Sequence, residues 1–221
     1  MGKKIFLSPS NQDGNRYAYG NTTEDVQCGR IAVALKAALE RCGFTVKMEQ
    51  YDSMQNRVAH SNNWGADMHI AIHTNAFDGK TGGTRVFYFT DNGYGNVASK
   101  AVYDELKVLT PGKSDNISAY PGLYELKATI ATAVYVEAEF HDVPEYAKWI
   151  IEHPTEIAVA ICKGVCNYYK VNYVAPVSTN AQPEKLYRLQ VGAFSKRENA
   201  EAYLKKIKAA GFDAFIVEAQ K

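Results

Sequence analysis

Short apolar segments alternate with amphipathic helical segments along most of the chain, and this alternation constrains the fold more than any other feature. In residues 67–73, Met68, Ile70 and Ile72 interleave with Ala71, so the segment is apolar on both faces. A strand inside a helix-covered sheet has this character. The predicted strands cover residues 5–7, 44–48, 67–73, 86–89 and 133–140. The pattern predicts an α/β fold with a largely parallel sheet flanked by helices on both faces.

The segments between these strands carry helical periodicity. Ile31, Leu35 and Leu39 recur at helical spacing until Gly43 ends the pattern. Further helices are predicted over residues 54–63, 96–109 and 144–169, the last with an apolar stripe along one side. In sheets of this kind, functional residues gather where strands end.

Length and composition allow one substantial core and a second, smaller unit. The chain has 221 residues, of which 46% are hydrophobic and 22% charged, as in an ordinary globular protein. Its first apolar run, Ile5 to Leu7, is shorter than the roughly 7 to 15 residues of a signal-peptide core. We therefore expect synthesis in the cytoplasm without a signal peptide, and no membrane insertion.

The C-terminal part has a different organisation. Residues 171–184 lose helical periodicity and contain two prolines, so we predict a linker there, after a domain over 1–170. Residues 185–221 predict a βαβ unit, with strands over 186–194 and 212–217 around a helix over 197–210. This unit has eight Lys or Arg against four Asp or Glu, a net charge of +4. A basic tail is suited to an anionic polymer, and we expect no nucleic-acid partner.

The four cysteines lack the close pairing of a structural zinc site. They are Cys28, Cys42, Cys162 and Cys166. We interpret them as buried thiols, and the last two share a helix face because they are four residues apart.

Three residues are candidates for chemistry. His73 ends a predicted central strand, Glu24 opens the first helix, and Glu137 lies among apolar residues near the end of another strand. A carboxylate in such surroundings is costly to ionise unless a metal or a catalytic proton compensates it. The alternative interpretation of Glu137 is an exposed strand face or a salt bridge, and that of His73 is a structural role.

Spacing argues against other combinations. His69 and His73 are about 13 Å apart along one strand, so they do not share a metal, and we expect His69 to be buried and hydrogen-bonded. Glu137 and Glu139 are separated by about 6.6 Å on the same strand. Two carboxylates favour a glycosidase, but a sugar ring needs them on opposing sides, so this hypothesis ranks lowest.

These residues together resemble a known family. Residues 71–76 (AIHTNA), preceded by 65–67 (GAD), and residues 136–141 (VEAEFH), together with Glu24, resemble the zinc-dependent N-acetylmuramoyl-L-alanine amidases of the amidase 3 type. The resemblance covers roughly residues 3–170. It implies a peptidoglycan hydrolase with one zinc ion per chain, with Glu24 and His73 as zinc ligands and Glu137 as general base and acid.

One position departs from the family pattern. The family has a zinc-binding His after the first strand, where this chain has residues 9–12 (PSNQ). Simple register places Asn11 there, whereas a shift of one residue places Gln12, which we favour because its longer side chain reaches back from a loop. An amide oxygen is a weaker zinc donor than imidazole, so reduced metal affinity is expected. Asn75 and His141 are candidates for substrate binding, and His141 is also a candidate to complete the metal site.

The C-terminal residues resemble a second family. Residues 186–195 (LYRLQVGAFS), continuing through 199–212, are similar to one half of a sporulation-related (SPOR-like) repeat, a cell-wall-binding unit. Because only half is present, we predict that two chains pair their tails and form a homodimer.

The resulting hypothesis is an amidase that cleaves the bond between N-acetylmuramic acid and L-alanine of the stem peptide through a zinc-activated water. Such an enzyme would be an endolysin or autolysin that reaches peptidoglycan after release by lysis or a holin-type partner. The alternative is a catalytically inactive peptidoglycan-binding protein, because the first ligand His is absent.

Overall fold

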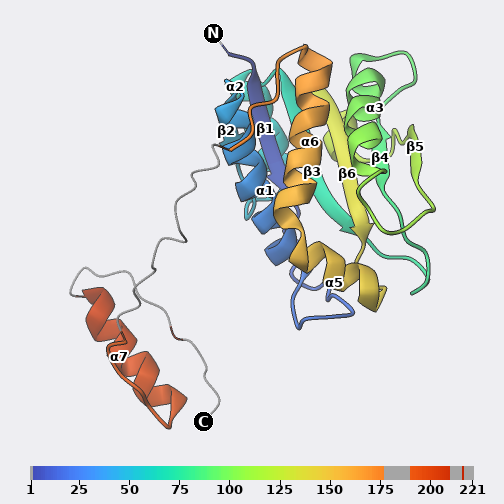
Figure 1. Ribbon diagram of the computed structural model, residues 1–221. Coiled ribbons are helices and arrows are strands. Elements are labelled where there is room, and N and C mark those ends of the chain that lie inside the picture. Colours follow the sequence, from blue (N-terminus) through green and yellow to red (C-terminus); the bar gives the residue numbers. More distant parts are fainter. Residues whose placement is uncertain (1, 177–189, 210–215, 217–221) are drawn as a thin grey trace. The chain divides into compact units, whose positions relative to one another are not determined.

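The computed structural model describes residues 2–176, 190–209 and 216 (Figure 1). The chain divides into two compact units, Met1–Val177 and Ser178–Lys221, and each is described by itself.

The first unit is built on a six-stranded sheet with the strand order β2-β1-β3-β6-β4-β5. Its strands are β1 (Lys4–Pro9), β2 (Thr45–Met48), β3 (Met68–Asn75), β4 (Arg85–Tyr88), β5 (Asn116–Ala119) and β6 (Thr132–Phe140). All neighbouring strands pair in parallel except β4 and β6. The predicted largely parallel sheet is therefore confirmed, and β5 is an additional strand that the sequence pattern did not indicate.

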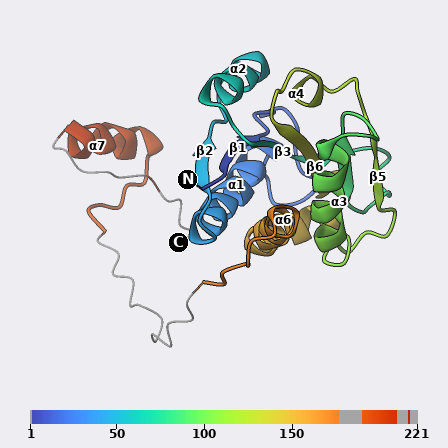
Figure 2. The same cartoon turned by 90° about the horizontal axis from the view of Figure 1, so that it is seen from above.

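Helices cover both faces of this sheet. They are α1 (Glu24–Arg41), α2 (Met54–Trp64), α3 (Tyr94–Leu106), α4 (Tyr124–Lys127), α5 (Pro144–Glu152) and α6 (Pro154–Tyr169). Figure 2 shows α2 and α4 on one side of the sheet and α1, α3 and α6 on the other. The predicted continuous helix over 144–169 is wrong in one respect, because it ends at Glu152 and restarts at Pro154. Proline fixes its own backbone and favours the first helical position, so it begins a new helix.

The main core lies between the sheet and the layer of α1, α3 and α6. Ile70 and Ile72 of β3 point into it and meet the stripe Ile157, Ile161 and Val165 of α6, all fully buried. On the opposite face, Ala71 and Tyr135 form a smaller cluster with Leu126 of α4, among others. This second face, only partly filled by apolar side chains, carries polar residues at the ends of β1, β3 and β6.

All four cysteines are free and buried, as predicted. The sulfur atoms of Cys42, Cys162 and Cys166 lie within 4.8 Å of one another, and no other cluster of three or more His, Cys, Asp or Glu ligand atoms this close occurs in the described ranges. Burial raises the pKa of the Cys166 thiol to about 12 and that of Cys162 further. The three thiols lie in the main apolar core.

In the second unit, the structure describes α7 (Arg197–Ala209), in agreement with the predicted helix over 197–210. The described part of the predicted strand over 186–194, residues 190–194, is not in a strand, and residues 186–189 lie outside the described residues. The predicted strand over 212–217 also lies outside them, apart from Ile216. Within the described chain, none of the helices combines the length and apolar character needed to cross a bilayer.

Candidate active site

The candidate site lies where the carboxyl ends of β1, β3 and β6 meet. His73 of β3 pairs with Glu137 of β6 across neighbouring parallel strands. The loop after β1 is held against β3 because the Ser10 amide donates to the Ile72 carbonyl at 2.9 Å. The same loop receives the start of α1 where the Glu24 amide donates to Asn15 at 2.9 Å. The topology thus brings side chains that are far apart in sequence, from Gln12 to Glu137, together at one edge of the sheet.

Glu24, His73 and Gln12 form one cluster. Oε1 of Glu24 lies 2.8 Å from Nδ1 of His73, and the Gln12 side-chain nitrogen lies 3.4 Å from the same Nδ1. Asn15 joins two of them, donating to Glu24 at 2.6 Å and to Gln12 at 3.0 Å. Asn11, the alternative to Gln12, is exposed and donates instead to the Asp52 carbonyl at 3.3 Å. Two potential ligands, Glu24 and Gln12, therefore converge on the Nδ1 edge of the His73 ring, which is the third.

Glu137 adds a further carboxyl group beside this cluster. Its Oε2 is buried and makes no hydrogen bond with any described residue. Burial raises the pKa of Glu137 to about 8, and the negative charge of Glu24 adds to this effect, while His73 opposes it. A carboxyl with a pKa near neutrality both accepts and donates a proton readily at physiological pH.

Three carboxyl groups lie around the His73 imidazole and shift its pKa. Burial opposes the ionisation of both His73 and Glu24, but their mutual contact outweighs it and keeps the Glu24 pKa below its usual range. The carboxylates of Glu125, Glu24 and Glu137 raise the pKa of His73 to about 9 despite burial. Three carboxyl groups thus surround a single imidazole, and two of them, Glu24 and Glu137, are not paired with Arg57 and are available to a bound cation.

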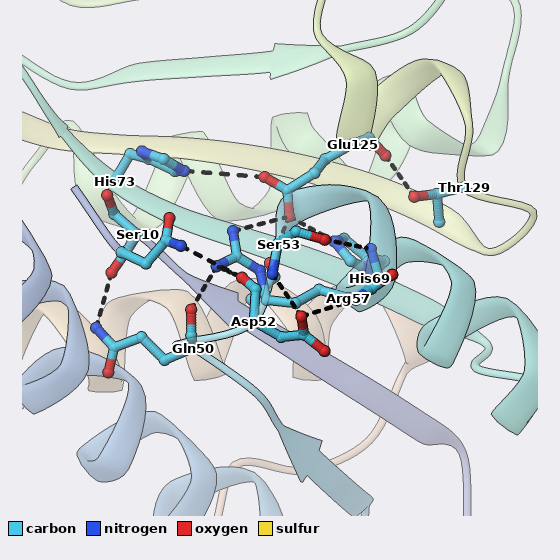
Figure 3. A network of polar contacts seen from close by, with 12 residues as sticks. Ser10, Gln50, Asp52, Ser53, Arg57, His69, His73, Glu125 and Thr129 are labelled. Atoms are coloured by element: carbon cyan, nitrogen blue, oxygen red, sulfur yellow. Dashed lines mark hydrogen bonds and ion pairs between the residues drawn. The ribbon is translucent and has the colours of Figure 1, made fainter.

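Sequence reasoning missed Glu125. It lies on α4, is fully buried, and its Oε2 is 3.9 Å from Nε2 of His73 (Figure 3). Its other oxygen lies 3.1 Å from His69 Nε2 and accepts a hydrogen bond from Ser8. Burial opposes ionisation, but these partners lower the pKa of Glu125. The helix has four residues, too few to show periodicity, so no spacing signal pointed to it. His69 is buried and hydrogen-bonded, as predicted.

Glu139 is held by the backbone. Its carboxylate accepts hydrogen bonds from the amides of Gly83, Phe140 and Gly112, the last at 3.0 Å. The pairing of β3 with β6 also shifts register between His73 and Asn75, so that Asn75 pairs with Phe140 rather than Glu139. Glu139 is thus occupied as an acceptor, which argues against the glycosidase hypothesis.

Asn75 and His141 have different surroundings. Asn75 is half-buried and lines a cavity of about 360 Å³ together with Phe77, Arg85 and others. His141 is buried, accepts or donates a hydrogen bond with Thr74 at 2.9 Å, and stacks on Tyr17 with ring centroids 4.9 Å apart. The structure therefore gives His141 a packing contact, and the role of each residue toward substrate stays a prediction.

The donor set is compatible with a zinc ion. In a tetrahedral site with bonds of about 2.0 to 2.2 Å, ligand atoms are about 3.3 Å apart. The two separations from His73 Nδ1, 2.8 Å to Glu24 and 3.4 Å to Gln12, are close to this value. A half-turn of the Gln12 amide exchanges its oxygen and nitrogen and directs the oxygen toward His73, in exchange for the hydrogen bond from Asn15.

Comparisons with known proteins identify the family of this chain. Residues 8–167 match the sequence profile of the family described as N-acetylmuramoyl-L-alanine amidase. The chain belongs to the N-acetylmuramoyl-L-alanine amidase family. Residues 170–221 of this amidase match the profile of the SPOR domain, so the resemblance at both ends of the chain is confirmed.

Individual relatives support the same conclusion. The amidase is 24% identical to a sporulation-specific N-acetylmuramoyl-L-alanine amidase of Bacillus subtilis (strain 168) and 27% identical to the N-acetylmuramoyl-L-alanine amidase CwlM of Bacillus licheniformis, in each case over 97% of this chain and 84% of the relative. The fold is similar to that of the catalytic domain of CwlV from Bacillus (Paenibacillus) polymyxa var. colistinus, with a TM-score of 0.70 and 15% identity over 77% of this chain and 99% of that one. An N-acetylmuramoyl-L-alanine amidase from Clostridium difficile 630 gives a TM-score of 0.69 at 21% identity, over 76% and 97%.

Proposed function

We propose that this amidase hydrolyses the amide bond between N-acetylmuramic acid and L-alanine in peptidoglycan, with one zinc ion held by Gln12, Glu24 and His73. The observation that carries the proposal is the convergence of these side chains beside Glu137 in a chain of this family. A catalytically inactive wall-binding protein is not favoured, because the family match and the unpartnered Glu137 carboxyl both indicate catalysis.

The residues divide the chemistry between them. A zinc ion at this position supplies a Lewis acid that polarises the scissile carbonyl and lowers the pKa of a water molecule toward about 7. Glu137 would take the proton of the attacking water and return it to the leaving alanine nitrogen, since its Oε2 has no hydrogen-bond partner among the described residues. Tyr135 stacks on His73 at 4.6 Å between ring centroids and so restricts rotation of the imidazole.

The cavity beside the site is suited to the stem peptide. It is lined by Asn75, Phe77, Arg85, Ser114 and Phe140, among others, and it adjoins the end of β6 that carries Glu137. Asn75 offers an amide to the peptide backbone, and Arg85 offers a positive charge to its carboxylates. We assign substrate positioning to this cavity and metal binding to the cluster around His73.

The C-terminal SPOR domain is proposed to bind peptidoglycan and hold the catalytic unit near its substrate. Its basic charge favours an anionic wall. Action on the wall after release by lysis, as an endolysin or autolysin, belongs to the same proposal. Pairing of two tails remains a prediction from sequence, and a sedimentation measurement showing a monomer at micromolar concentration would remove it.

A product analysis tests the proposed function. Purified peptidoglycan is incubated with the zinc-loaded protein, with and without a chelator, and the soluble products are analysed by mass spectrometry. An amidase releases intact stem peptides with new alanine amino ends, and chelation abolishes this release. New reducing ends would indicate a glycosidase, and no release in any condition would indicate a binding protein.

Two substitutions test the ligand assignment. Gln12→Ala is expected to weaken zinc binding and Gln12→His to strengthen it, because imidazole is the better donor. Asn11→Ala is the matched control, since Asn11 faces Asp52 instead. Zinc affinity is measured by competition with a chromophoric chelator, and an effect of Asn11→Ala as large as that of Gln12→Ala would refute the assignment of Gln12.

A further inference from the structure

We infer that Glu125 is the positioning residue that fixes the ring orientation of His73, by accepting a hydrogen bond from Nε2 while Nδ1 faces the metal. This inference rests on the proposed metal site and adds a residue that lies outside it. Glu125 is a buried carboxylate that takes no part in the proposed mechanism.

The two edges of the His73 ring have separate surroundings. Nδ1 faces Glu24 and Gln12, whereas Nε2 is buried and lacks a hydrogen-bond partner among the described residues. The nearest charged atom to Nε2 is Oε2 of Glu125, at 3.9 Å. A histidine that binds a metal through one nitrogen carries its proton on the other and normally donates it to a carboxylate, carbonyl or water. Glu125 is placed to accept that proton.

Glu125 is itself held in place from three sides. His69 Nε2 lies 3.1 Å from Oε1, Ser8 donates a hydrogen bond to the same oxygen, and Arg57 Nη2 lies 4.0 Å from it (Figure 3). All these contacts reach Oε1, so Oε2 is left for His73. One oxygen of this carboxylate is anchored and the other is directed at the imidazole. Such a group is suited to fixing the orientation of the His73 ring, and not only to packing.

The supporting contacts extend into the frame of the protein. Arg57 of α2 is 2% exposed and donates to the Gln50 carbonyl at 2.5 Å and to the Asp52 carbonyl at 3.3 Å. Its guanidinium balances the buried charge of Glu125. The neighbour of Glu125 on α4, Leu126, packs on the sheet beside Ala71 and Tyr135, which fixes the helix above β3 and β6. A series of contacts therefore connects the backbone after β2, through Arg57 and Glu125, to His73.

A direct ligand role for Glu125 is less compatible with the geometry. Its carboxylate approaches the edge of the imidazole opposite to that facing Glu24 and Gln12. A single metal ion bound at Nδ1 lies in the direction of those two residues, away from Glu125. The arrangement is that of a carboxylate–histidine–metal triad, in which the outer carboxylate acts through the histidine.

Zinc affinity of matched variants tests the inference. Glu125→Gln replaces the carboxylate with a neutral group of similar size, and we expect its zinc dissociation constant to rise by about 10-fold to 100-fold. Ser8→Ala is the comparison, because it removes one of the three contacts to Oε1 but keeps the carboxylate and the other two, so a smaller effect is expected. Both variants are first compared with the wild type by thermal unfolding without metal. If Ser8→Ala weakens zinc binding as much as Glu125→Gln, the effect is structural and the inference is overturned.

A measurement on the wild type keeps the inference testable if Glu125→Gln does not fold. In the zinc-loaded protein labelled with ¹⁵N-histidine, long-range ¹H–¹⁵N spectra report which nitrogen of His73 carries the proton. The inference requires a protonated Nε2 and a metal-bound Nδ1, and the opposite assignment overturns it. Failure of the proposed function is distinguishable, because the wild type would then bind zinc no more tightly than His73→Ala.

Discussion

Glu137 and Glu139 lie two residues apart on β6, and their carboxyl groups have different surroundings: Glu139 is fully buried, whereas Glu137 is half-buried with a buried Oε2. Burial raises the pKa of both carboxyl groups, but only Glu139 receives backbone amides from Gly83, Phe140 and Gly112 in compensation. Glu137 has an oxygen with no hydrogen bond to any described residue. The difference indicates that one carboxyl group is part of the framework and that the other is kept free for chemistry.

Glu139 joins two loops that border the cavity. Its carboxylate binds the Gly83 amide in one loop and the Gly112 amide in the other, while Thr81 and Ser114 from these loops line the cavity. Gly83 has a φ of +133°, and a β-carbon on Gly112 would lie 2.1 Å from the Gly83 nitrogen. The loops therefore pack too closely for side chains at these positions, and the Glu139 carboxylate satisfies the amides that the packing buries.

The largest expected difference between the two residues is in turnover. Glu137→Gln is expected to lower the rate of peptidoglycan hydrolysis by about 10²-fold to 10⁴-fold, because it removes the proton acceptor. Zinc affinity is expected to change little, since Glu137 is outside the proposed ligand set. Turnover is measured by release of stem peptides at saturating zinc.

Glu139→Gln is the matched control for this experiment. It makes the same chemical change two residues away on the same strand, and we expect it to retain turnover within about tenfold. If Glu137→Gln retains hydrolysis, or if both variants lose turnover equally, Glu137 does not have the catalytic role that distinguishes it from Glu139.

The sequence predicted the frame of this site better than its details. The apolar alternation around Ile70 and Ile72 defined β3 and the position of His73 at its end, because burial on both faces leaves a strong pattern. The amide donors to Glu139 were not predictable, since they come from loops whose geometry has no periodic signal. The register shift between β3 and β6 was also hidden, because it depends on the pairing of two strands far apart in sequence.

The next largest effect is expected in how the unfolding free energy depends on pH in the wild type and in Glu137→Gln. With chelator present, Glu137 has a folded pKa of about 8 against a usual value of 4.5. The protonated carboxyl is therefore favoured by folding, and this contribution is complete below pH 4.5 and is lost as the pH rises through about 8. Relative to Glu137→Gln, the wild type should lose a few kcal/mol of unfolding free energy over this window.

Urea unfolding of both proteins between pH 4.5 and 9 measures this effect. The difference between their unfolding free energies reports the contribution of Glu137 together with its effect on the neighbouring His73, whose pKa Glu137 raises. A difference that stays constant across the window would mean that the Glu137 carboxyl is hydrated or paired in solution, contrary to its surroundings in the structure.

The smallest effect is expected for Glu139→Gln, in its unfolding free energy at pH 7. A glutamine side chain retains one carbonyl oxygen for the Gly83 and Phe140 amides, but its NH₂ group cannot accept from Gly112. One buried backbone amide is then unpaired, which costs about 1 to 3 kcal/mol of unfolding free energy. Urea unfolding at pH 7 measures this loss, and hydrogen exchange at the Gly112 amide should accelerate with it. If Gly112 stays protected and the stability is unchanged, Glu139 does not hold the loops together, and the contrast with Glu137 then depends on catalysis alone.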